Sequence, residues 1–245
     1  HEIKDMDELK RRLGEDRRFF SYFHPALEDE PIIFVQVALT NGLGKSIQEI
    51  TKPRSDGDQK YDTATFYSIS NCQEGLSRVT LGNFLIKRVV FEIQEELPNI
   101  KHFGTLSPIP GFRDWFSYLE DVKIKNILGD VPIESISFLK SSDLKVGDPR
   151  IVANKVAITK LVAHYLMNEK NHKQLPINDV CRFHLGNGAI IDDIVINANV
   201  SEVGLNRSFG VMVNYLYELK NIEKNHEEYI NNKTIIISDK LKKII

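Results

Sequence analysis

Apolar and β-branched residues gather in short runs along the first third of the chain, with polar segments between them. The run PIIFVQVAL (31–39) opens with a proline and is typical of a buried strand, and TATFYSIS (63–70) has the same character. Between them, KPRSDGDQKYD (52–62) has the charged, glycine-containing composition of a surface loop. The pattern therefore predicts two core strands joined through an exposed segment.

A helical period follows the second of these strands. Its apolar positions recur close to every 3.6 residues: Phe84, Leu85, Val89, Ile93 and Leu97. Pro98 marks the end of this helix, and HFGTLSP (102–108) returns as a strand. A strand, a glycine-containing turn, a helix and a strand thus follow one another, an order that suits a helix N-terminus directed at a bound phosphate.

The second half of the chain mixes helical and strand patterns. GFRDWFSYLE (111–120) is predicted to be helical, and ANKVAITKLVAHYLMNEKNHK (153–173) a longer helix. RFHLGNGAIIDDIVINANVS (182–201) and FGVMVNYLYEL (209–219) are interpreted as β-rich, turn-separated segments, and the Lys/Ile-rich tail as a last helix. We expect one α/β domain over residues 1–245, of the α+β type, with a mixed, partly antiparallel sheet flanked by helices.

Composition narrows the class of protein. The 245 residues are 42% hydrophobic and 27% charged with a formal net charge of −2, which favours no nucleic-acid or membrane partner. Cys72 and Cys181 form no disulfide framework and, with the histidines, show no metal-ligand spacing, so no metal site is predicted. The charged N-terminus is unlike a secretory signal, and no apolar run approaches the roughly 20 residues that span a bilayer. These features predict a reducing compartment, the cytoplasm or an organelle matrix.

Two glycine-containing segments resemble phosphate-binding loops. TNGLGKS (40–46) ends like a nucleotide-binding loop, but position 39 is Leu where that motif requires Gly, so we interpret it as a strand-to-helix turn. SRVTLGN (77–83) precedes the helix that begins near Phe84. There, unsatisfied backbone N–H groups, the small Gly82 and the charge of Arg78 suit a pyrophosphate, although the pattern alone favours an ordinary turn.

Two further segments carry candidate catalytic groups. In LSPIPGF (106–112), the following proline holds Ser107 in an extended conformation with its hydroxyl in a defined direction. In RFHLGNGA (182–189), strand alternation would point His184 away from the apolar side chains beside it, and Asn187-Gly188 is a tight-turn pattern. For Ser107 the alternative is a rigid loop with no catalytic role, and the residues alone do not choose between the two interpretations. For His184 the alternative is a structural histidine, which the residues alone favour.

Together these stretches resemble malonyl-CoA decarboxylase. Six segments match in the family's order and extend over nearly the whole chain: MDELKRRLG (6–14), FYSIS (66–70), LGNFLIKRVV (81–90), LSPIPGF (106–112), FHLGNGA (183–189) and GVMVNYLY (210–217). LSPIPGF together with FHLGNGA is the most specific part of the resemblance.

The resemblance implies the acyl-CoA-binding fold of the N-acetyltransferases (the GNAT fold), in which a strand, a loop and a helix grip coenzyme A. It makes Ser107 and His184 the catalytic pair and places Ser68, Asn187 and Tyr217 around the substrate pocket. The ligands that it implies for the pyrophosphate are Ser77, Arg78, Val79, Thr80, Leu81, Gly82 and Asn83.

The implied reaction converts malonyl-CoA to acetyl-CoA and carbon dioxide without a separate cofactor, because the thioester of the substrate accepts the electrons. His184, titrating near neutrality, would donate the proton, and Ser107 would either relay a proton or only position the carboxylate. A GNAT-type acyltransferase and a non-catalytic CoA-binding module stay open as alternatives. The family also carries an N-terminal helical domain that mediates oligomerisation. This chain starts after that domain, so a homo-oligomer is expected of a longer protein.

Overall fold

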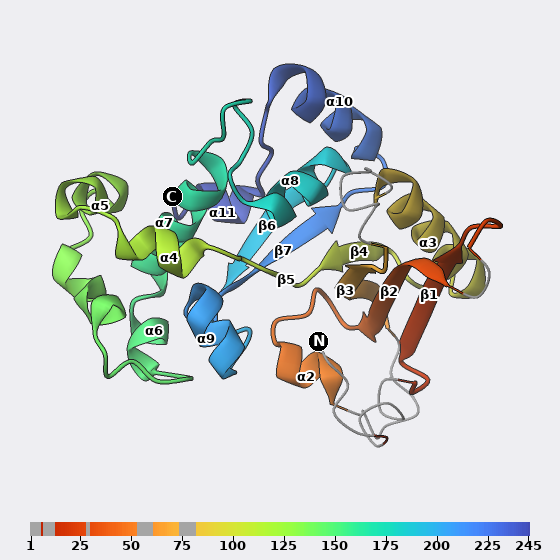
Figure 1. Cartoon of the computed structure of the whole chain (residues 1–245), viewed down its shortest axis with the longest axis horizontal. Helices are drawn as coiled ribbons and strands as arrows, with labels where there is room; N and C mark the ends of the chain where they lie inside the picture. Colours follow the sequence, from red (N-terminus) through yellow and green to blue (C-terminus); the bar gives the residue numbers. More distant parts are fainter. Residues whose placement is uncertain (1–5, 7–12, 28–29, 53–60, 74–81) are drawn as a thin grey trace. The chain divides into compact units, whose positions relative to one another are not determined.

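The computed structural model describes residues 6, 13–27, 30–52, 61–73 and 82–245 (Figure 1). Its residues group into two compact units by their contacts. The first unit contains His1–Leu106 and Leu216–Glu218, and the second contains Ser107–Tyr215 and Leu219–Ile245.

The first unit is built on a mixed sheet. Its strands are β1 (Arg17–Phe23), β2 (Pro31–Thr40), β3 (Thr63–Asn71) and β4 (His102–Thr105). β1, β2 and β3 pair antiparallel in that order, β4 runs parallel to β3, and residues 216–217 of β7 (Met212–Tyr217) pair antiparallel with β4. The strands predicted over 31–39 and 63–70 are confirmed, as is the partly antiparallel sheet.

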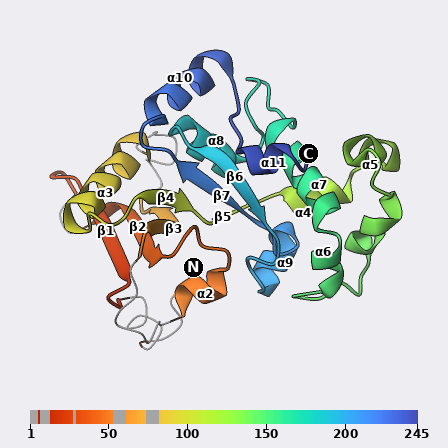
Figure 2. The same cartoon turned by 180° about the vertical axis from the view of Figure 1, so that it is seen from behind.

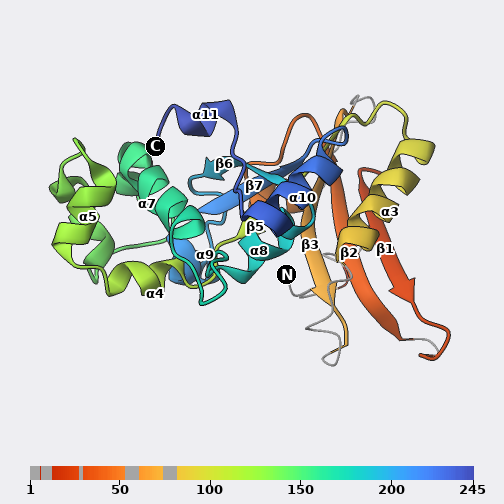
Figure 3. The same cartoon turned by 90° about the horizontal axis from the view of Figure 1, so that it is seen from above.

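In the described part of this unit, the helices α2 and α3 accompany these strands. The parallel pair β3 and β4 requires a crossover, and α3 (Gly82–Glu96) supplies it, with Val89 and Ile93 fully buried. Figure 3 shows α3 beside β1 and β2. The short helix α2 (Ile47–Thr51) begins at Ser46, whose hydroxyl accepts a hydrogen bond from the Glu49 N–H, so the turn predicted over residues 40–46 is confirmed.

The second unit combines three strands with most of the helices. β5 (Ser107–Pro108) pairs antiparallel with β7, and β6 (Ile190–Val195) also pairs with β7. The helical elements are α4 (Phe112–Ser117), α5 (Asp121–Leu128), the 3₁₀ helix η2 (Ile133–Lys140), α6 (Pro149–Ala153), α7 (Lys155–Met167), α8 (Asp179–Gly186), α9 (Glu202–Ser208), α10 (Ile222–Asn232) and α11 (Asp239–Lys242). Helix α8 contacts β6 and lies beside β7, as Figure 2 also shows.

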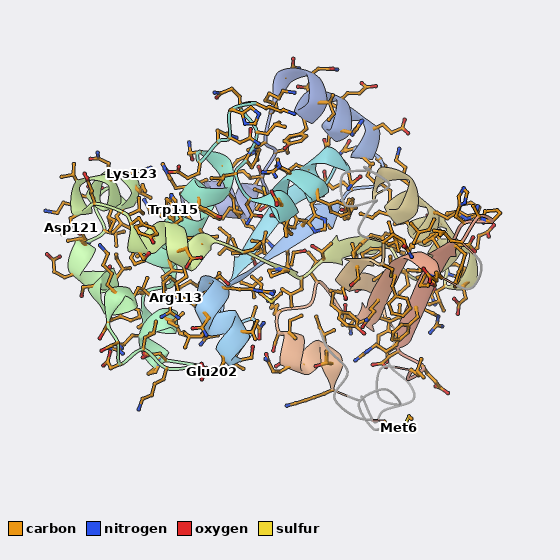
Figure 4. The ribbon with its side chains drawn as sticks, in the orientation of Figure 1. Met6, Arg113, Trp115, Asp121, Lys123 and Glu202 are labelled. Atoms are coloured by element: carbon orange, nitrogen blue, oxygen red, sulfur yellow. The ribbon has the colours of Figure 1, made fainter. Side chains whose placement is uncertain are left out.

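Helix α7 and an aromatic cluster form the core of the second unit. Ile158, Leu161, Val162 and Leu166 of α7 are completely buried. On α4, the rings of Phe112 and Phe116 meet Phe209 edge-on, with centroids 5.9 and 5.8 Å apart. At the surface, the Lys123 ammonium of α5 lies 6.0 Å from the Trp115 ring of α4 (Figure 4). Packing of this kind fixes the loops that leave the core.

The sequence predictions for the second half need two corrections. Residues 182–186, predicted to be β-rich, belong to helix α8, and the tail forms two helices, α10 and α11, where one was expected. The helix predicted over 153–173 is confirmed but ends at Met167. Across the part of the chain that the structure describes, no helix has both the length and the apolar character to span a membrane.

Candidate active site

Ser107 is held at the start of a rigid loop. It forms β5 with Pro108, pairs with Val213 of β7 and is 5% exposed. The extended conformation predicted for a serine before proline is therefore confirmed. The loop then turns at Gly111, whose φ of +79° is unfavourable for residues with a Cβ atom, and α4 begins at the next residue. The backbone that carries the Ser107 hydroxyl is thus held by strand pairing at Ser107 and by a constrained turn at Gly111.

His184 lies in the last turn of α8 and not on a strand, which corrects the alternation argument. Asn178 begins the helix, because its Oδ1 accepts a hydrogen bond from the Cys181 N–H at 2.8 Å, and Asp179 is favourably placed in the first turn. The strand expectation rested only on His184 and its two apolar neighbours, and three consecutive residues are too few to distinguish a strand period from a helical one. The helix turns the imidazole inward, and His184 is 4% exposed.

The structure brings the two predicted catalytic residues together. Ser107 Oγ and His184 Nε2 are 2.9 Å apart, a hydrogen bond between residues 77 positions apart in sequence. The Tyr215 ring of β7 stacks on the imidazole, with centroids 4.4 Å apart and an interplanar angle of 26°. The hydrogen bond therefore sets the distance between the hydroxyl and the imidazole, and the stacked tyrosine sets the orientation of the imidazole ring.

Burial also sets the charge of the pair. Desolvation lowers the pKa of His184 from 6.5 to about 3, because the charged imidazolium is disfavoured away from water. The expectation that His184 titrates near neutrality is wrong for this structure, in which the imidazole is neutral at pH 7. The site is thus an uncharged hydroxyl–imidazole pair, able to accept a proton when an anion raises the pKa of the histidine.

The turn after α8 is held by its own side chains and by α10. Asn187 Nδ2 donates to the Phe183 carbonyl at 2.7 Å, so this amide closes the end of α8. Asn225 of α10 donates to the Gly188 carbonyl at 3.2 Å. Gly188 has a φ of +80°, and a Cβ atom there would overlap the Ile222 carbonyl. The tight turn predicted at Asn187-Gly188 is confirmed, whereas a role for Asn187 in the substrate pocket stays a prediction.

The other predicted site residues belong to the first unit or lie outside the described residues. Residues 77–81 lie outside them, and α3 begins at Gly82, followed by Asn83. Ser68 is on β3, with its hydroxyl 3.5 Å from that of Ser70. Tyr217 is buried at the end of β7, and burial raises its pKa well above 10. Their roles in binding the substrate stay predictions.

Three residues that hold the pair or the segments carrying it were not predicted from the sequence. Tyr215 stacks on His184, Asn178 caps α8, and Tyr165 of α7 donates a hydrogen bond to the Pro110 carbonyl at 2.9 Å. Only Asn178 had a local pattern that could reveal it, an Asn–Asp pair that opens a helix. Among the residues that the structure describes, no group of three or more His, Cys, Asp or Glu side chains is placed to hold a metal ion.

Comparison with known proteins identifies the family. The sequence model of the malonyl-CoA decarboxylase C-terminal domain matches residues 1–245. The chain belongs to this family. The rat mitochondrial malonyl-CoA decarboxylase is 36% identical over 100% of this chain and 54% of its own length. The mitochondrial malonyl-CoA decarboxylase of Anser anser anser is 37% identical over 98% of this chain and 52% of its own length. The chain thus spans about half the length of the curated malonyl-CoA decarboxylases that it matches.

Solved structures give the same relationship. The malonyl-CoA decarboxylase of Rhodopseudomonas palustris superposes with a TM-score of 0.88 at 38% identity and covers 100% of this chain and 56% of its own. The malonyl-CoA decarboxylase of Agrobacterium vitis also has a TM-score of 0.88, at 37% identity, and the match covers 100% of this chain and 61% of its own. The GNAT-like loading domain of CurA from Lyngbya majuscula, with a TM-score of 0.52 at 14% identity over 90% of this chain and 85% of its own, confirms the GNAT-like fold alone.

Proposed function

We propose that this chain removes carbon dioxide from malonyl-CoA and releases acetyl-CoA, with Ser107 and His184 as its catalytic residues. The observation that carries the proposal is the buried hydrogen bond of 2.9 Å between Ser107 Oγ and His184 Nε2. Membership of the malonyl-CoA decarboxylase family supports the choice of reaction and substrate.

Decarboxylation of a malonyl thioester makes few chemical demands. The bond between the α-carbon and the carboxylate breaks, its electron pair moves into the thioester as an enolate, and the α-carbon then takes up a proton. The reaction therefore consumes one proton for each carbon dioxide released. A site that orients the carboxylate and supplies that proton accelerates the step.

The Ser107–His184 pair suits both tasks. A malonyl carboxylate beside the neutral imidazole favours the protonated form, because an opposite charge within about 4–6 Å raises the pKa of a histidine. The proton then arrives with the substrate, and His184 passes it on as the enolate forms. Ser107 lies within hydrogen-bonding distance of that imidazole, where it relays the proton or orients the carboxylate.

The remaining parts of the proposal concern binding and assembly. We propose that residues 77–83 bind the pyrophosphate of coenzyme A, that the reaction needs no further cofactor, and that a longer protein forms homo-oligomers. Replacement of Arg78 by alanine should raise the KM for malonyl-CoA and leave kcat nearly unchanged, because the phosphates lie far from the bond that breaks. A fall in kcat alone would contradict this assignment.

The test is acetyl-CoA formation from malonyl-CoA by the purified chain and two serine variants. Ser107→Ala should lower kcat about a hundredfold or more, in the range of general acid–base catalysis. Ser117→Ala, which removes an exposed serine hydroxyl at the end of α4 in the same unit, is the matched control and should leave kcat unchanged.

Two outcomes would overturn the proposal. One is a chain that binds coenzyme A but forms no acetyl-CoA from malonyl-CoA. The other is Ser107→Ala with the activity of the wild type. Turnover that appears only when an amine acceptor is added would instead identify an acyltransferase, since decarboxylation needs no second substrate.

A further inference from the structure

Asn178 connects the two segments that carry the catalytic pair. Its side chain is at the N-terminus of α8, where Oδ1 accepts from the Cys181 N–H at 2.8 Å. Its Nδ2 donates to the carbonyl of Pro110 at 2.9 Å. One amide, 2% exposed, therefore joins the helix that holds His184 to the loop that begins at Ser107.

Both connected segments are stiff. Pro108 and Pro110 restrict the backbone between Ser107 and the carbonyl that Asn178 binds, and the remaining path to His184 is a regular helix. The same Pro110 carbonyl also accepts from the Tyr165 hydroxyl at 2.9 Å. Both lone pairs of this oxygen are thus occupied by buried donors. A displacement at the connection is transmitted to the Ser107 hydroxyl, because little in the loop can absorb it.

The Nδ2 donor of Asn178 takes no part in capping the helix. Capping requires only an acceptor, and serine or aspartate caps about as well as asparagine does. The Nδ2 group is needed for the Pro110 carbonyl alone. A serine at position 178 keeps the cap and is too short to reach Pro110, and an aspartate keeps the cap but turns a carboxylate oxygen toward the carbonyl oxygen.

We propose that Asn178 is a positioning residue that sets the hydrogen-bond distance between Ser107 and His184. The expected effect of Asn178 on turnover rests on the proposed decarboxylation. Its expected effect on the distance between Ser107 and His184 rests only on the hydrogen bonds described above. Asn178 acts through the pair and does not contact the reacting atoms.

The kinetic test combines Asn178→Ser with Ser107→Ala. Asn178→Ser should lower kcat for malonyl-CoA about tenfold or more, since small misplacements of catalytic groups are costly, with KM within about twofold of wild type. In the Ser107→Ala background the same change should have almost no further effect, because the hydroxyl that it positions is gone. An equal loss in both backgrounds would overturn the proposal. Asn178→Asp, which also keeps the cap, should behave like Asn178→Ser and replaces it if that variant does not fold.

A spectroscopic test decides the geometry without turnover. The ring resonances of His184, assigned by their loss in His184→Gln, should shift in Asn178→Ser. They should stay in place in Ser201→Ala, which removes the cap of α9 in the same unit. Unchanged His184 resonances in Asn178→Ser would overturn the proposal. If the wild type forms no acetyl-CoA, the proposed function fails and these resonances alone decide the role of Asn178.

Discussion

The buried imidazole makes the stability of this protein depend on pH in a way that one substitution can isolate. His184→Gln keeps a polar group near the position of Nε2, opposite the Ser107 hydroxyl, and removes an imidazole whose pKa is about 3 in the folded protein and about 6.5 in the unfolded chain. The variant is expected to lose some stability at every pH. The informative quantity is how the difference in the free energy of unfolding between the two proteins changes with pH.

The size of that change follows from the two pKa values of His184. Burial lowers the pKa to about 3 in the folded protein, against 6.5 for an ordinary histidine. Below pH 6.5 the unfolded chain binds a proton on His184 that the folded chain excludes. The contribution to stability is therefore fully present above pH 6.5 and is lost as the pH falls toward 3. Between pH 7 and pH 5 the loss is about 2 kcal/mol.

Urea unfolding at pH 5, 6 and 7 measures this directly. The wild type should lose about 2 kcal/mol more than His184→Gln between pH 7 and pH 5, since the other titrating groups are shared by both proteins. Parallel pH profiles for the two proteins would refute the reasoning. That result would show that His184 is as accessible to protons in the folded state as in the unfolded chain.

Three further predictions concern proton uptake on binding, the turn at Gly188 and the two cysteines. A malonyl-CoA analogue that cannot lose carbon dioxide should take up close to one proton on binding, because its carboxylate raises the pKa of His184. Calorimetry in two buffers of different ionisation enthalpy measures this uptake, and acetyl-CoA, which lacks the carboxylate, should show none. Gly188→Ala should cost about 3 kcal/mol in urea unfolding, because φ is +80° and the new Cβ overlaps the Ile222 carbonyl, and an unchanged midpoint would contradict this. In the native protein only the exposed Cys72 should react quickly with a thiol reagent. Burial raises the pKa of Cys181 to about 12, so the second thiol should appear only on unfolding.

The neutral state of the pair has a consequence for catalysis. The pair carries no negative charge, so it does not repel the malonyl carboxylate. In the absence of substrate, the protein also does not have to stabilise a charged imidazolium in an apolar environment. The proton is required only when the substrate is bound, which links its arrival to the reaction that consumes it. A pair that stays neutral until it is occupied also avoids the desolvation cost of a permanently buried ion.

The sequence by itself determined the elements whose patterns are long or strongly constrained. The runs at 31–39 and 63–70 are strands, the helical period from Phe84 ends before Pro98, and Gly188 takes the positive φ that its turn requires. The serine before proline is extended. These features depend on interactions between near neighbours in the chain, and such interactions are already present in the order of the residues.

Tertiary structure decided the rest. The meeting of Ser107 with His184 depended on packing between segments 77 residues apart. The neutral charge of the imidazole depended on burial, which no local pattern encodes. Distance, solvent exposure and pKa are properties of the packed interior, so they appear only after distant parts of the chain have come together.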